Sequence, residues 1–194
     1  MAGAAPFSAI KTALAARAPA RLERPGSSWA AVSVILAPVE DPAILLLRRA
    51  VRAGDPWSGH IGLPGGRRDP GDADLYATAA RETLEETGIA LDAAQLLGEL
   101  DDLGPRAVGA PRIAVRPFVF GLARRPPVAP CEEAAGHFWF PLHRLRAHEI
   151  REVSVPDHPR KVRAYLLGEQ VVWGLTHRII EGLLQATGSE RGGA

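Results

Sequence analysis

The segment between Leu63 and Ile89 constrains this chain more than any other part of its sequence. It reads LPGGRRDPGDADLYATAARETLEETGI. Its first half carries three glycines and two prolines, which predicts a loop whose backbone can approach a ligand closely. Its second half predicts a helix over Asp74–Thr87, with Gly88 at the position of a C-terminal cap. The fold must therefore lead a glycine-rich loop directly into a polar helix.

This helix gathers three carboxylates on one face. At about 100° per residue, Glu82 and Glu86 project within about 40° of each other, and Glu85 lies about 60° from Glu82 on the other side. Like charges at these spacings repel, which costs stability unless they are neutralised. Carboxylate oxygens suit Mg²⁺ or Mn²⁺ rather than zinc. The alternative is a solvated acidic face paired with Arg81 and other arginines, but the glycine-rich loop in front of the helix favours a metal.

The loop and helix together resemble the Nudix box, the loop–helix–loop signature of Nudix hydrolases, usually written G-x5-E-x7-R-E-U-x-E-E-x-G-U with U apolar. Gly66 stands at the first glycine, and Asp72 stands where the family usually has Glu. The remaining positions are matched in register by Arg81, Glu82, Glu85, Glu86, Gly88 and Ile89. Two further departures are the eight residues between Asp72 and Arg81, where seven are usual, and Thr83 at a position that is usually aliphatic.

The resemblance implies an α+β fold, a Nudix-type α/β/α sandwich with a mixed central sheet. It also implies a hydrolase in which water attacks a diphosphate that links a nucleoside to another group. Glu82, Glu85 and Glu86 would be ligands of Mg²⁺ or Mn²⁺ together with the Gly66 carbonyl, and the metal would acidify a bound water. Arg81 would take part in catalysis by holding these carboxylates through charge-assisted pairs.

The general base is expected in a second loop. Many family members carry an acid six residues before a tryptophan, and Glu133 has that offset from Trp139. Glu133 is therefore the predicted base. The alternative is that Glu132 and Glu133 are both solvated loop acids, in which case Glu82 is the base.

Five residues near the box in sequence, or on the strands around it, are predicted to bind substrate. Arginines suit phosphate oxygens, and an aromatic ring in the loop before the box either stacks on a base or fixes the loop. These residues are Arg49, Trp57, His60, Arg67 and Arg112.

The eight-residue spacing resembles the branch of the family that includes coenzyme A diphosphatases. The stretch from Gly59 to Gly66, GHIGLPGG, is similar to that branch's Gly-Gln-Ile-Ala-Phe-Pro-Gly-Gly. Trp57 stands where the branch usually has His. Coenzyme A or a related derivative is the first expected substrate, with ADP-ribose, dinucleotides and nucleoside triphosphates as alternatives. A Nudix-fold ligand sensor without catalysis is a further alternative, against which the intact R-E-x-x-E-E counts.

Size and charge bound the remaining possibilities. The 194 residues suit one domain, for which we expect an N-terminal helical extension over 1–25, a Nudix domain over 26–187 and a flexible tail over 188–194. A net charge of +1 argues against broad contact with nucleic acid. No apolar run approaches the roughly 20 residues of a membrane span. We therefore expect a cytoplasmic protein that acts on a small nucleotide, alone or as a homodimer.

Apolar patterns predict the other elements. Phe7, Ile10 and Leu14 share one face of a helix with Ser8 as its N-cap; the segment either docks on the domain or is a transit peptide. Two buried strands are expected at Ala30–Ala37 and Ala43–Leu47. Further elements are predicted at Ile61–Leu63, Leu96–Leu103, Ile113–Leu122, His137–Phe140, Leu142–His148, Glu152–Val155, Arg163–Leu167, Gln170–Trp173 and Leu175–Ala186.

Overall fold

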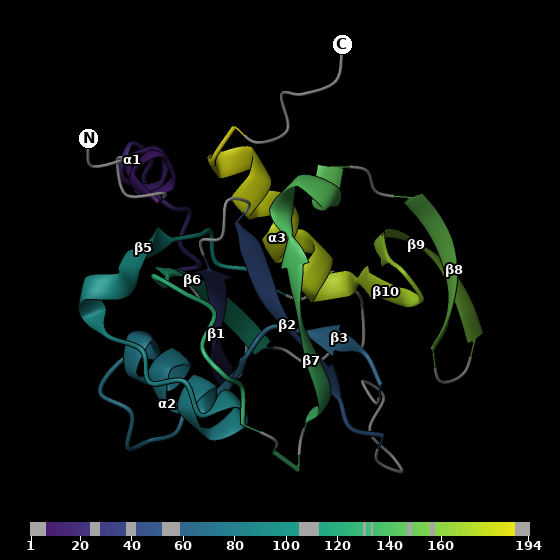
Figure 1. The fold of residues 1–194 in the computed structure, drawn as a ribbon, viewed down its shortest axis with the longest axis horizontal. Coiled ribbons are helices and arrows are strands. Elements are labelled where there is room, and N and C mark those ends of the chain that lie inside the picture. The colour runs from purple at the N-terminus through teal and green to yellow at the C-terminus, as the bar shows by residue number, and fades with distance from the viewer. Residues whose placement is uncertain are drawn as a thin grey trace.

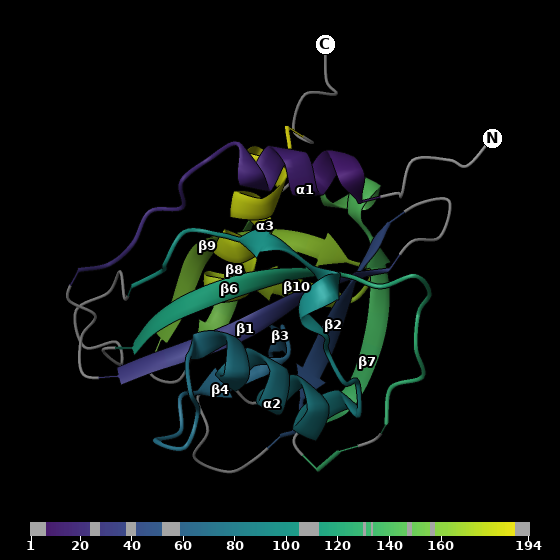
Figure 2. The same cartoon turned by 90° about the vertical axis from the view of Figure 1, so that its left-hand side faces the viewer.

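A mixed β-sheet carries helices on both faces. The computed structural model describes residues 7–23, 28–37, 42–51, 59–104, 113–129, 131–132, 134–146, 149–155 and 158–188. Helix α2 (Leu75–Thr87) covers one face of the sheet, and helices α1 (Ser8–Ala15) and α3 (Gly174–Ala186) lie on the other, as Figure 2 shows. This is the α/β/α arrangement expected from the sequence.

The central sheet runs in the order β3-β2-β1-β6-β5, with β4 paired to β1 and β7 paired to β2. Its strands are β1 (Ser28–Ala37), β2 (Ala43–Arg49), β3 (Ile61–Gly62), β4 (Gly65–Arg67), β5 (Leu96–Glu99), β6 (Ile113–Gly121) and β7 (Ala134–Pro141). Strands β1 and β6 are parallel along their length, and the other pairs are antiparallel. The sheet is therefore mixed, as expected.

Strands β1 and β2 run side by side over a short distance. Among the described residues they pair only at Leu36–Ile44 and Ala37–Ala43. Beyond this point the segment 61–67 fills the gap, because β3 pairs with the end of β2 and β4 pairs with the first half of β1. The sequence predicted a loop at Gly65–Arg67, which is wrong: these residues form a strand inside the sheet.

Strand β1 is buried on both faces, which explains its almost continuous apolar sequence. Val32 and Val34 belong to the large core cluster shared with α3. Ala31 and Ile35 alternate with them and face the side covered by α2. Ser33 shares that second face and is fully buried, so its hydroxyl needs a partner within the protein.

A second, antiparallel sheet of β8 (Glu149–Val155), β9 (His158–Leu167) and β10 (Gln170–Trp173) lies beside β3 in Figure 1. This confirms the expected late sheet. Strand β10 leads directly into α3. Two 3₁₀ helices complete the elements, η1 (Ala93–Gln95) and η2 (Leu142–Arg146). No helix in the described ranges is long and apolar enough to cross a membrane.

Helix α1 is docked on the domain. Phe7 and Leu14 are buried in the core cluster that also holds residues of α3. Arg21 contacts the buried Asp102, whose carboxylate also pairs with Arg116 at 2.8 Å. The prediction that Ser8 caps this helix is wrong: the helix begins at Ser8, and Phe7 occupies the N-cap position without a side-chain hydrogen bond.

Gly121 gives Phe7 its place on the sheet. A Cβ at Gly121 would lie 2.5 Å from the Cδ2 of Phe7, closer than real Cβ contacts allow. Gly121→Ala should therefore displace Phe7 and lower the free energy of unfolding by about 1–3 kcal/mol in urea titrations. Gly136→Ala is the matched control, because a Cβ there meets nothing within 4 Å. Equal stability of the two variants would contradict this docking.

Candidate active site

Strand β4, Gly65–Arg67, which we call the glycine segment, and the acidic face of α2 line one cleft of about 540 Å³. The end of β2 and the residues just before β7 complete its wall. We call this the acidic cleft; its lining residues are Arg49, Gly65, Gly66, Arg67, Glu82, Glu85, Glu86, Cys131 and Glu132. Segments distant in sequence thus bring four acids and two arginines to one place.

Local sequence fixes both ends of α2. The Asp74 carboxylate accepts a hydrogen bond from the Ala77 N–H at 2.7 Å, which caps the N-terminus. Gly88 has φ 72° and donates its N–H to the Leu84 carbonyl at 2.9 Å. Glycine adopts this left-handed conformation without strain. The predicted helix and its C-terminal glycine are confirmed.

Two of the acids contact the glycine segment directly. The Gly65 N–H donates to Oε2 of Glu86 at 2.9 Å. The Glu82 carboxylate packs against Gly66 so closely that a Cβ at Gly66 would lie 2.5 Å from Glu82 Cδ. Glycine is therefore required at position 66 if the carboxylate is to lie against the backbone.

Arg81 neutralises the acidic face from its side. Its NH1 lies 3.0 Å from Oε1 of Glu82 and 3.0 Å from Oε2 of Glu85. Its Nε and NH2 donate to the two carboxylate oxygens of Asp72 at 2.9 and 3.0 Å, and NH2 also donates to the Arg67 carbonyl at 3.2 Å. One guanidinium thus joins the loop and the helix.

Asp72 is the fixed end of this network. Besides Arg81, the Asp69 N–H and the Thr78 hydroxyl each donate to its Oδ2 at 2.9 Å. The hydrogen bonds from Arg81 hold the pKa of Asp72 well below its usual range, although burial alone would raise it. The aspartate that replaces the usual glutamate is therefore an ionised anchor for Arg81.

The donor set of the cleft suits a hard divalent cation. Glu82, Glu85 and Glu86 supply carboxylate oxygens, and Gly66 supplies backbone beside them. In the described part of the chain, no three acidic, histidine or cysteine side chains are already gathered as a ligand set. Instead Arg81 and the Gly65 N–H occupy carboxylate oxygens, so binding a cation would require these side chains to turn toward a common point.

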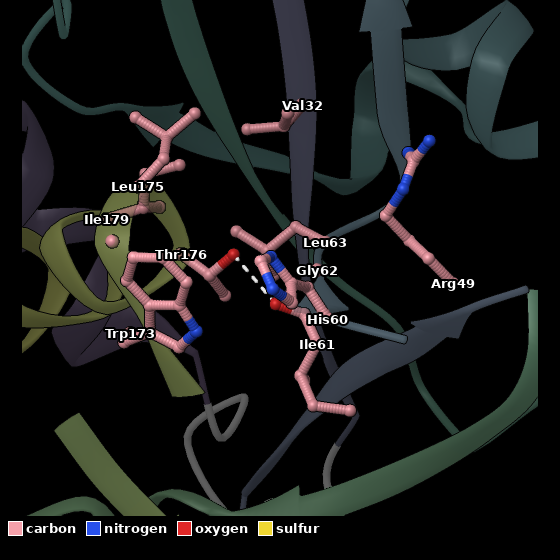
Figure 3. Close-up of a pocket in the computed structure, with 11 residues that line it drawn as sticks. Val32, Arg49, His60, Ile61, Gly62, Leu63, Trp173, Leu175, Thr176 and Ile179 are labelled. Carbon is pink, nitrogen blue, oxygen red and sulfur yellow. Dashed lines mark hydrogen bonds between the residues drawn. The ribbon is translucent and has the colours of Figure 1, made fainter. Parts of the chain in front are cut away.

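A second cavity, of about 270 Å³, adjoins the acidic cleft and shares Arg49 with it. We call it the apolar pocket; it is lined by Val32, Arg49, His60, Ile61, Gly62, Leu63, Trp173, Gly174, Leu175, Thr176 and Ile179. Figure 3 shows the start of α3 facing strand β3 across it. The His60 and Trp173 rings meet edge to face with centroids 5.0 Å apart, and the Thr176 hydroxyl donates to the Ile61 carbonyl at 3.1 Å.

A family model described as the NUDIX domain matches residues 28–159. The chain belongs to the Nudix family. The uncharacterized Nudix hydrolase NudL of Yersinia pestis (strain Pestoides F) is 35% identical to it over 150 residues, which cover 75% of this chain and 72% of NudL. As a Nudix hydrolase, the chain is a pyrophosphohydrolase that acts on phosphoanhydrides, and the family implies a nucleotide-derived small molecule as substrate.

Solved structures of Nudix proteins share the fold. A MutT/nudix family protein from Enterococcus faecalis is 18% identical, covers 95% of this chain and 75% of its own, and has a TM-score of 0.58. The MutT protein from Methanosarcina mazei Go1 is 20% identical, covers 88% of this chain and 99% of its own, and has a TM-score of 0.55. Both likenesses support the Nudix fold.

The Nudix box residues lie together. Gly66, Glu82, Glu85 and Glu86 line the acidic cleft, and Arg81 contacts the carboxylates from beside it. Among the predicted substrate contacts, Arg67 lines the acidic cleft, His60 lines the apolar pocket, and Arg49 lines both. Three predicted residues lie outside the described residues: Trp57, Arg112 and Glu133.

Sequence reasoning missed some of the lining. Trp173 was predicted as the end of a strand, but it is half-buried and lines the apolar pocket with Thr176. Glu132 and Cys131 line the acidic cleft. The available signal for Trp173 and Thr176 was the Trp-Gly-Leu-Thr stretch at 173–176, where β10 ends and α3 begins, which resembles the same Nudix branch as the box spacing.

The Asp72 anchor predicts a pH-dependent stability difference. At pH 7, Asp72→Asn should lower the free energy of unfolding by about 1.5–3 kcal/mol, the range for hydrogen bonds to a charged group. Because the folded-state pKa is depressed, this contribution is complete above the ordinary aspartate pKa near 4 and is lost progressively as the pH falls below it.

Urea unfolding at pH 7 and pH 3 measures this difference, with Asp69→Asn as the control. Asp69 is an exposed acid of the same loop whose Oδ1 accepts from the Gly71 N–H, a bond that asparagine retains. Equal free energies of unfolding for the parent and Asp72→Asn at pH 7 would contradict an ionised anchor. So would a difference between them that is as large at pH 3 as at pH 7.

Proposed function

We propose that the chain is a divalent-metal-dependent Nudix hydrolase that cleaves the diphosphate bond of coenzyme A or a related nucleoside diphosphate derivative. The observation that carries the proposal is that Arg49 lines both the acidic cleft and the adjoining apolar pocket. A charged diphosphate and a less polar organic group can thus bind side by side with one arginine between them. The eight-residue spacing and the GHIGLPGG stretch support the coenzyme A branch.

Glu82, Glu85, Glu86 and the Gly66 carbonyl would hold Mg²⁺ or Mn²⁺. When bound, the ion neutralises phosphate charge and lowers the pKa of a coordinated water. Arg81 would keep Glu82 and Glu85 in position. Their carboxylate oxygens would bond to its guanidinium without the ion and to the ion when it is bound. The close packing of Glu82 on Gly66 supports this set, because the carboxylate already lies against the Gly66 backbone.

Arg49 and Arg67 would bind the nonbridging phosphate oxygens. Both line the acidic cleft, and phosphoryl transfer depends mainly on positioning and on neutralising these oxygens. Trp57 and Arg112 would be further substrate contacts, as the sequence pattern indicates. In the apolar pocket, the paired rings of His60 and Trp173 would contact the organic part of the substrate.

Glu133 is proposed as the general base, with Glu82 as the alternative. The immediate neighbour of Glu133, Glu132, lines the acidic cleft. This supports the assignment, because the residue next to Glu133 in sequence lies where a proton would be taken from a water in the cleft. It also makes Glu132 a competitor for the role.

A hydrolysis panel tests the substrate. Coenzyme A, ADP-ribose, NADH, diadenosine polyphosphates and nucleoside triphosphates would be compared with Mg²⁺ and with Mn²⁺. The proposal expects the highest kcat/KM for coenzyme A. A preference for ADP-ribose or a dinucleotide would keep the reaction and replace the substrate, and hydrolysis of none of them would favour a ligand sensor.

The base is tested by a matched pair of variants. Glu133→Gln should lower kcat by about 10²–10⁴-fold, the usual contribution of a positioned base, and leave Mn²⁺ affinity nearly unchanged. Raising the pH should partly restore its rate, because hydroxide replaces the lost base. Glu132→Gln is the control and should be mild. A reversed order would assign the base to Glu132, and parental rates in both would assign it to Glu82.

A further inference from the structure

The face of α2 that meets the sheet is unusually polar. Thr78, Thr83 and Thr87 are all fully buried, and each has a hydrogen-bonded hydroxyl. Thr78 donates to Asp72, and Thr87 donates to the Thr83 carbonyl. Thr83 differs from these two because it bonds to another element of the fold. It is also the box position that is usually aliphatic.

Thr83 bonds to Ser33 of β1. Its hydroxyl donates to the Ser33 Oγ at 2.8 Å, and the Ser33 hydroxyl donates to the Ala79 carbonyl at 3.3 Å. Ser33 and Thr83 are both fully buried. A buried hydroxyl pair costs desolvation that an apolar pair would not, so its use here needs a reason beyond packing.

Ser33 also holds the glycine segment. Its backbone N–H donates to the Pro64 carbonyl at 2.8 Å, directly before Gly65 and Gly66. The two residues that precede it, Ala31 and Val32, pair with Gly66 and Gly65 in the sheet. A single residue of β1, Ser33, therefore bonds to the residue before Gly65 through its backbone and to helix α2 through its side chain.

Because of the position of Thr83 on α2, this hydrogen bond affects where the Glu82 and Glu86 carboxylates lie. Thr83 directly follows Glu82 and precedes Glu86 by three residues, so any rotation or sliding of α2 on the sheet moves both acids. The buried apolar side chains beneath α2 include those of Ala79, Phe118 and Phe120. Such contacts are not directional, whereas a hydrogen bond fixes both rotation and height.

We propose that Ser33 and Thr83 are positioning residues, which set α2 against the glycine segment at the spacing that the metal site requires. This inference rests on the proposed function, because it needs a divalent cation in the acidic cleft. The pair does not touch the cation or the substrate. It acts through Glu82, Glu86 and Gly66.

Two variants of Thr83 separate positioning from packing, with Mn²⁺ binding measured by calorimetry in the absence of substrate. Thr83→Val keeps the shape and deletes the bond, and Thr83→Ser keeps the bond and deletes a methyl. Thr83→Val should weaken Mn²⁺ binding by about two- to tenfold, since lost pre-organisation cannot exceed the worth of one neutral hydrogen bond. Thr83→Ser should bind like the parent.

The double variant Ser33→Ala/Thr83→Val gives the decisive comparison. Removing both polar partners should leave the unfolding midpoint near the parental value, because neither buried hydroxyl then has to be desolvated on folding. Mn²⁺ affinity should nevertheless stay low. If affinity recovers together with stability, the pair is structural only and the inference is wrong. Should Thr83→Val fail to fold, Ser33→Ala makes the same test from the strand.

Two outcomes distinguish failure of the positioning role from failure of the proposed function. Parental Mn²⁺ affinity in Thr83→Val would overturn the positioning role and leave the proposed function intact. Absence of Mn²⁺ binding by the parent protein would overturn the proposed function, and the positioning role with it.

Discussion

The close approach of three backbone segments at Gly65 and Gly66 is the constraint on which the rest of the site depends. Gly65 has φ 143°, and a Cβ there would lie 2.3 Å from the Ala31 carbonyl oxygen. A Cβ at Gly66 would meet the Glu82 carboxylate at 2.5 Å. Strand β1, the glycine segment and α2 can therefore meet only where two side chains are missing. Strands β3 and β4 fill the gap between β1 and β2, and Gly65, Gly66 and Arg67 line the acidic cleft.

This arrangement places like charges close together before any ligand is present. Arg81 offsets that cost because it pairs with Glu82, Glu85 and Asp72 at once. The Gly65 N–H donates a hydrogen bond to the Glu86 carboxylate. These partners are exchangeable, since each holds carboxylate oxygens that a cation could also bind. Asp72 differs because it is buried and holds Arg81 with both oxygens. Asp72 therefore keeps Arg81 in place when Glu82 and Glu85 turn from the guanidinium toward a cation.

The parts of this fold that could be predicted from the sequence are those encoded by neighbouring residues. Asp74 and Gly88 mark the ends of α2, and apolar runs mark β1 and β2, because caps and burial patterns act over a few positions. The Ser33–Thr83 bond joins residues fifty positions apart, so neither side of it carries a local signal. The strand at Gly65–Arg67 was likewise hidden, because it depends on two other strands separating. Trp173 was predicted as the end of a strand, whereas it lines the apolar pocket where β10 leads into α3.

The central claim is that the acids on α2 form a cation site, and Mn²⁺ titration of the metal-free protein tests it most directly. Glu82→Gln and Glu86→Gln would be compared with the parent and with Glu169→Gln, an exposed acid in the turn between β9 and β10. Removing one charge from a repelling face should leave the unfolding midpoint unchanged or higher, while Mn²⁺ affinity falls at least tenfold in both variants. Glu169→Gln should bind like the parent. Parental Mn²⁺ affinity in both Glu82→Gln and Glu86→Gln would contradict the account.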